Sequence, residues 1–86
     1  MLYCEKIKNM ILEINEFVEI EYDTPLIAEE ILDSLSIIYL VTELENEYSV
    51  IIKEEDINPN NFYSVETISQ LVNKLIRWSR FDIYFL

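Results

Sequence analysis

Apolar residues recur along much of this chain at intervals of three and four positions, which is the spacing of one face of an α-helix. From Tyr3 to about Glu19 they are interleaved with Lys and Glu, so this segment is predicted to be the first helix. Its expected buried side consists of Ile7, Met10, Ile11, Ile14 and Phe17 or Val18.

Two further segments show the same periodicity. One is expected to begin at Asp33 or Ser34, because either side chain can cap a helix, and to bury Ile37, Val41, Leu44 and Tyr48. The other is expected to be capped by Ser64 and to turn Val65, Ile68, Leu71, Val72 and Leu75 inward.

The segments between these helices carry weaker signals. Glu21 to Leu32 is predicted to be a loop, because Pro25 pushes the residue before it out of the helical region. Glu54 to Asn61 is predicted to hold a short helix that Pro59 interrupts. Three long helices and one short helix predict an all-α protein, a small four-helix bundle formed by a single domain.

The length of 86 residues fits one domain with a modest core. The one cysteine, Cys4, cannot form an internal disulfide, which suits a reducing cytoplasm. No apolar run reaches the roughly 18 residues of a membrane span, and Met1 to Lys8 mixes charge with apolar residues, unlike a signal peptide. We therefore expect a cytoplasmic protein.

Two absences restrict the possible chemistry. The chain has no His, the commonest general base and metal ligand, and no Gly, which phosphate-binding loops and nucleophile elbows require. Asp56 begins a segment similar to a calcium loop, but Asn61 and Thr67 stand where that loop needs Gly and Glu. We therefore expect neither catalytic residues nor a metal site.

The net charge is −11, from 17 acidic and 6 basic residues. Such a surface repels nucleic acid phosphates and anionic membranes, and it favours partners with basic faces. Alternatively, the charge serves only to keep the protein in solution.

The tripeptide Asp33-Ser34-Leu35 has neighbours that give it a specific meaning. Alone it could be a helix start with a capping Ser. Around it, the chain resembles the acyl carrier protein family, the phosphopantetheine-binding carriers, over roughly Ile7 to Leu75. The resemblance rests on five segments in order: 23–26 (DTPL), 32–35 (LDSL), 40–48 (LVTELENEY), 52–56 (IKEED) and 61–68 (NFYSVETI).

The resemblance implies that Ser34, flanked by Asp33 and Leu35, accepts 4′-phosphopantetheine from coenzyme A. A separate Mg²⁺-dependent phosphopantetheinyl transferase attaches the arm in that family. An acyl or aminoacyl group then travels on the arm as a thioester, supplied by a loading ligase or acyltransferase. We expect a monomeric carrier of this kind.

The sequence departs from the family pattern at two places. Ile31 stands where the family commonly has Gly, two residues before the Asp. The exposed face of the second helix, expected to bind partners through Leu35, Tyr39, Glu43 and Asn46, also includes Thr42 and is less acidic than is usual. This favours a discrete, D-alanyl-carrier-like protein over a fatty-acid carrier. The alternative is a small acidic adaptor or inhibitor without a prosthetic group, in which Ser34 is only a cap.

The segment from Arg77 to Leu86 follows the part that resembles the family. Trp78, Phe81 and Phe85 have helical spacing, and few solvated tails are so aromatic. One hypothesis is that the last helix continues and packs on the first, near Leu2, Tyr3 and Met10. The other is that the segment contacts a partner or a second copy.

Overall fold

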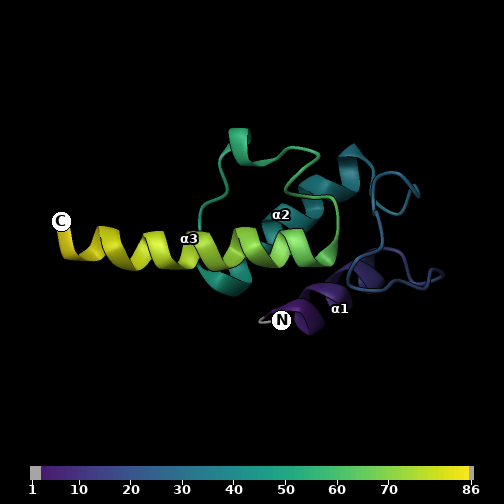
Figure 1. Ribbon diagram of the computed structural model, residues 1–86, viewed down its shortest axis with the longest axis horizontal. Helices are drawn as coiled ribbons and strands as arrows, with labels where there is room; N and C mark the ends of the chain where they lie inside the picture. Colours follow the sequence, from purple (N-terminus) through teal and green to yellow (C-terminus); the bar gives the residue numbers. More distant parts are fainter. Residues whose placement is uncertain (1–2, 86) are drawn as a thin grey trace.

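The computed structural model describes the backbone of residues 3–85 and the side chains of residues 3–78. Its elements, in order, are α1 (Cys4–Ile14), α2 (Ser34–Tyr48), the short 3-10 helix η1 (Glu54–Asp56) and α3 (Val65–Phe85) (Figure 1). The all-α architecture of three long helices and one short helix is therefore confirmed. No helix within the described residues has the length and apolar character needed to cross a membrane.

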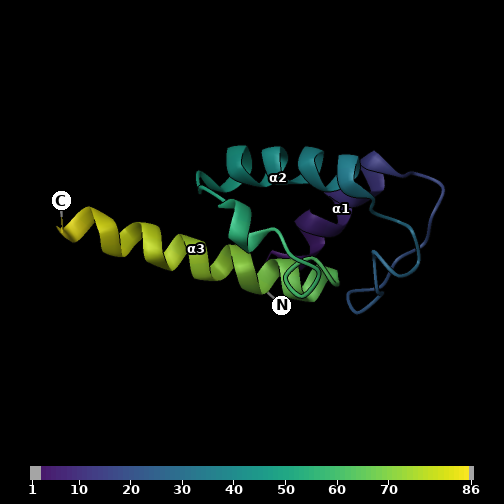
Figure 2. The ribbon, with the colours of Figure 1, turned by 90° about the horizontal axis from the view of Figure 1, so that it is seen from above.

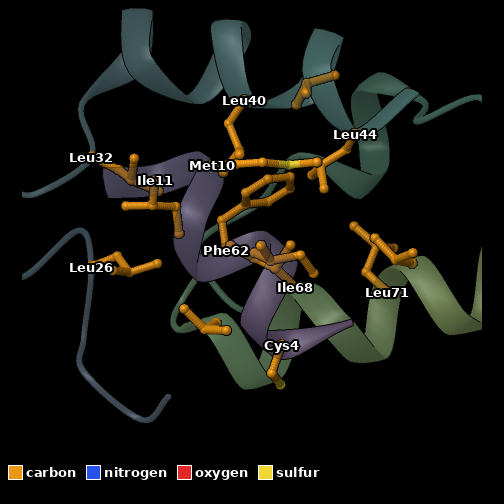
Figure 3. Close-up of a cluster of buried hydrophobic side chains, with 14 of the residues drawn as sticks. Cys4, Met10, Ile11, Leu26, Leu32, Leu40, Leu44, Phe62, Ile68 and Leu71 are labelled. Carbon is orange, nitrogen blue, oxygen red and sulfur yellow. The ribbon is translucent and has the colours of Figure 1, made fainter. Parts of the chain in front are cut away.

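The core lies where the three long helices meet, with α1 in contact with both α2 and α3. Ile7 and Ile11 of α1 are fully buried, as their spacing predicts. Phe62, in the segment before α3, has no exposed surface and lies among side chains of α2 and α3 in Figure 3. Burying a side chain of this kind stabilises the fold by about 1.5–3 kcal/mol.

The first helix is shorter than the sequence predicts. It ends at Ile14 instead of near Glu19, and Asn15 closes it. Continuing the helix would place Glu16 and Glu19 at its carboxyl end, where the helix dipole disfavours negative charge. Of the two residues that were alternatives for the buried side, Phe17 lies in the following loop with 92% of its surface exposed, and Val18 is half-buried against the core.

The second helix begins where the sequence predicts, with Asp33 as its N-cap and Ser34 as its first residue. Its buried side is centred on Leu40, Val41 and Leu44, whereas Ile37 and Tyr48, both predicted to be buried, are only half-buried. Leu40 is therefore a core residue that the predicted stripe omitted.

The loop of residues 15–33 joins α1 to α2 and is bound to the start of α3. The backbone N–H of Leu26 donates to the Tyr63 carbonyl at 2.8 Å, and the Glu66 N–H donates to the Tyr22 carbonyl at 3.0 Å. The Tyr22 hydroxyl also donates to Glu5 of α1 at 2.6 Å. The loop thereby holds the start of α2 in a defined position.

The loop contains a left-handed residue at Glu30, with φ of 58°. The next residue, Ile31, occupies the position where the family commonly has Gly, and its side chain is buried. A non-Gly residue in this region costs about 1–2 kcal/mol. Because the chain has no Gly, the turn at this point is made by Glu30 and Ile31 serves as a core residue.

The last helix starts with reciprocal hydrogen bonds between Ser64 and Thr67, so the predicted cap is confirmed. The Ser64 hydroxyl accepts from the Thr67 N–H at 3.3 Å, and the Thr67 hydroxyl accepts from the Ser64 N–H at 2.9 Å. The helix then runs for 21 residues, about 32 Å.

The carboxyl-terminal turns of α3 extend past every other element in both Figure 1 and Figure 2. The described chain is correspondingly elongated, 44 × 24 × 20 Å. The helix continues as one of the two hypotheses requires, but its backbone leads away from α1. Leu2 and the side chains that follow Trp78 lie outside the described residues.

Candidate functional site

Ser34 is the first residue of α2 and its side chain is exposed to solvent. The cap of the helix is supplied by Asp33, whose Oδ1 accepts from the backbone N–H of Ser36 at 2.8 Å. Within the described part of the chain, the Ser34 hydroxyl makes no hydrogen bond. It is therefore a free hydroxyl at the positive end of a helix dipole.

The electrostatics of this helix start are set by Asp33. Hydrogen bonds from Ser36, first from its backbone N–H and then from its side chain, hold the pKa of the Asp33 carboxyl below its ordinary value of 3.8. The carboxylate is therefore ionised at neutral pH. It keeps its capping geometry under the conditions in which Ser34 would react.

An apolar groove of about 310 Å³ opens beside Ser34. Ser34, Ile37 and Ile38 of α2 form one wall, and the segment from Ile57 to Phe62 forms the other, with Ile27 at its edge. Asn58 fixes this second wall, since its side-chain oxygen accepts from the Asn61 N–H at 2.8 Å and its amide donates to the Glu55 carbonyl at 3.1 Å. A chain attached to Ser34 would thus have an apolar surface directly beside it.

A second, more polar groove of about 660 Å³ lies against the loop that precedes α2. Ser34 and Ile37 again form part of it, together with Ile27, Glu30, Leu32 and Asp33. Ser34 therefore lines both grooves. A group held on its hydroxyl can lie in either groove or extend into solvent.

The exposed face of α2 carries the residues that the sequence suggests for partner binding. Leu35 and Tyr39 are 77% and 59% exposed, Asn46 is exposed and Glu43 is half-buried. With Glu13, Ile14 and Ser36, Leu35 and Tyr39 also line a shallow groove of about 340 Å³ between the end of α1 and the start of α2. The face thus combines exposed apolar side chains near Ser34 with one acidic side chain, Glu43, farther along α2.

Ile38 and Ile27 belong to the site but were not among the residues that the sequence suggested. Ile38 is 60% exposed and lies one helical turn after Ser34. Its signal in the sequence was an apolar residue four positions after Ser34, on the side of the helix away from the core. Ile27 lies in the loop and could be placed beside Ser34 only through the fold of that loop.

The chemistry available at this site is that of an acceptor. Ser34 is a hydroxyl whose nearest acidic neighbour, Asp33, is already engaged by Ser36. Within the described residues, no group of three or more His, Cys, Asp or Glu side chains is placed to hold a metal ion. The site presents an exposed hydroxyl beside apolar surfaces, a geometry suited to the covalent attachment of a chain.

Comparison with known families gives one match. A family model described as "Phosphopantetheine attachment site" matches residues 5–75, which is most of the chain and includes α1, α2, η1 and the first half of α3. No curated protein matches the sequence.

Proposed function

Because this chain belongs to the phosphopantetheine-binding carrier family, as the match over residues 5–75 shows, we propose that Ser34 is the residue that holds its arm. The chain is a carrier protein that bears a 4′-phosphopantetheine arm and is not itself catalytic. Family membership also implies two kinds of partner, a phosphopantetheinyl transferase and the enzymes of a biosynthetic pathway.

The single observation that carries the assignment is that Asp33, and not Ser34, caps α2. Asp33 caps α2, so the Ser34 hydroxyl can be esterified without loss of the cap. The resulting phosphodiester would be an anion at the amino end of a helix of 15 residues, where the dipole stabilises it by about 0.3–1 kcal/mol. The residues around Ser34 therefore fit the group.

The arm, when attached, supplies a terminal thiol on which an acyl or aminoacyl group is held as a thioester. The protein supplies the attachment point, the apolar groove lined by Ile37, Ile38 and Phe62, and a tether. Tethering raises the effective concentration of the cargo at each partner enzyme. We propose a discrete acyl or aminoacyl carrier, similar in style to D-alanyl carriers, that is loaded by a ligase or acyltransferase.

The proposed partner-binding face is the exposed side of α2, through Leu35, Tyr39, Glu43 and Asn46. Exposed aromatic side chains frequently anchor interfaces, and the surplus of acidic residues favours partners with basic surfaces over nucleic acid. Cys4, the only cysteine, is a buried free thiol. This supports our proposal that the carrier works in the cytoplasm, where thiols stay reduced.

Incubation with coenzyme A, Mg²⁺ and a promiscuous phosphopantetheinyl transferase tests the assignment. Intact mass should show one arm added to the wild-type chain, and peptide mapping should place it on Ser34. Ser34→Ala should gain nothing, whereas the matched control Ser36→Ala, in the same helical turn, should be modified. An unmodified wild-type chain would instead support the adaptor hypothesis, and modification at another residue would refute the assignment to Ser34.

A further inference from the structure

A second groove lies at the opposite end of α2 from Ser34. It has a volume of about 590 Å³ and is formed by residues 49–51, Lys53, Glu55 and Asp56 on one side and by Lys74, Leu75 and Trp78 of α3 on the other. The carboxyl end of α2 is about 22 Å along the helix from Ser34. The groove is therefore separate from the attachment site and from both grooves beside it.

Two large apolar side chains are exposed where α3 leaves the body of the protein. Ile51 is 78% exposed and Trp78 is 57% exposed, and both line this groove. The backbone next to Ile51 is held against α2, because the N–H of Ile52 donates to the Glu45 side chain at 2.8 Å. The pair forms an apolar surface on a defined support, the kind of surface that commonly marks a protein contact.

The charges of the groove differ from those of the rest of the molecule. Lys53 and Lys74 balance Glu55 and Asp56, so the net charge of −11 belongs entirely to the residues outside this set. None of the four side chains forms an ion pair with another described residue; the ion pair of the described part joins Lys6 to Glu47. Two bases and two acids are thus available to a partner.

From these features we infer that the groove is the contact surface of a symmetric dimer, with a second copy of this chain as its occupant. A twofold interface places the same patch on both sides, so the patch must complement itself. A groove with equal numbers of acids and bases and two exposed apolar side chains meets this requirement. The rest of the surface is acidic and would repel an identical copy.

The shape of α3 agrees with this arrangement. Its backbone continues as a helix through residue 85, past all other elements (Figures 1 and 2). Seven residues follow Trp78 in this helix, about 10 Å, and the sequence places Phe81 and Phe85 at helical spacing from Trp78. In the dimer, the projecting helix of each copy lies along the groove of the other. The inferred dimer differs from the monomer that the sequence suggests.

Sedimentation equilibrium on the 86-residue chain tests the inference, from about 1 µM to about 1 mM, a range that brackets weak and moderate dimers. The wild type should approach twice the chain mass as concentration rises. Ile51→Glu should raise the dimer dissociation constant at least about tenfold. Phe17→Glu is the matched control, because it makes the same change of charge at an exposed apolar residue in another part of the chain, and it should leave the constant within about threefold.

Two charge-reversal variants test directly whether the groove is complementary to the same groove of a second copy. Lys74→Glu alone should weaken the dimer, and adding Glu55→Lys should restore it, because the double variant again has balanced charges in the groove. Modification of Ser34 should leave dimerisation unchanged. The dimer is therefore tested independently of the proposed function. A wild-type chain that stays monomeric throughout the range would overturn it, as would equal effects of Ile51→Glu and Phe17→Glu.

Discussion

The carboxylate of Asp33 accepts a 2.8 Å hydrogen bond from the backbone N–H of Ser36, and this bond caps α2 without help from Ser34. An N-cap of this kind satisfies one of the four backbone donors that a helix leaves open at its start. The Ser34 hydroxyl, which lies between the acceptor Asp33 and the donor Ser36 in the sequence, is consequently available for modification. Stability and attachment at this helix start therefore depend on different side chains.

Ser34→Ala should abolish attachment of the arm and leave the fold intact. Because the replaced side chain is exposed and is not the cap, the free energy of unfolding should change by no more than about 0.5 kcal/mol. Asp33→Ala should lower it by more, since it removes the cap. Urea unfolding together with intact mass measures both effects. A Ser34→Ala protein less stable than Asp33→Ala would contradict the division of roles.

The contribution of Asp33 should depend on pH in a defined direction. Its pKa is lowered in the folded state by the hydrogen bonds from Ser36, relative to an ordinary value of 3.8. The stabilisation is therefore fully present above that value and is lost as pH falls from it through the lower pKa of the folded state. The difference in melting temperature between wild type and Asp33→Ala should be constant from pH 7 to 5 and shrink below about 4. A difference that grows in acid would show that the cap acts through the protonated form.

The exposed face of α2 should govern transfer of the arm. Tyr39→Ala and Glu43→Lys should each lower kcat/KM of a phosphopantetheinyl transferase about fivefold or more, which corresponds to the loss of about 1 kcal/mol at an interface. Tyr63→Ala and Glu54→Lys are matched controls, a tyrosine of similar exposure before α3 and an acid on η1. Equal kinetics for the face variants and their controls would remove this face from the interface.

Added salt should stabilise the fold. Seventeen acids against six bases repel one another, and the ion pair between Lys6 and Glu47, at 2.7 Å and largely exposed, offsets little of this. Screening shortens the Debye length from about 30 Å at 0.01 M to about 10 Å at 0.1 M. The melting temperature should therefore rise with NaCl over that range. A flat response would show that the acids are too widely spaced to interact.

The sequence was sufficient for the helices whose apolar spacing coincides with a cap. Asp33 and Ser64 each stand directly before a periodic segment, and both helices begin there. The end of α1 could not be read in the same way, because Phe17 and Val18 continue the apolar spacing after Ile14. In that segment Phe17 is exposed, whereas Val18 packs against the core from the loop.

The candidate site could also be predicted only in part from the sequence. Ser34 and its position at a helix start followed from the sequence, because a cap and an apolar stripe define that start locally. The grooves beside it did not, because Ile27 and the segment from Ile57 to Phe62 reach Ser34 only through loops. Their placement depends on backbone hydrogen bonds such as that from Leu26 to Tyr63, which no pattern in the sequence indicates.

Shortening the chain to end at Ile76 distinguishes the two hypotheses for the last segment. The shortened chain keeps Leu71 and Val72, which are buried, and loses Trp78 and the turns of α3 that extend beyond the other elements. We therefore expect the free energy of unfolding to fall by less than about 1 kcal/mol, since the turns that are removed extend beyond the other elements and the buried Leu71 and Val72 are kept. The dimer should be lost, because each copy would lack the helix that lies along its partner's groove. Urea unfolding at low micromolar concentration measures the first effect without a contribution from association, and sedimentation measures the second. A loss of several kcal/mol with no change in mass would show instead that the segment packs on its own chain.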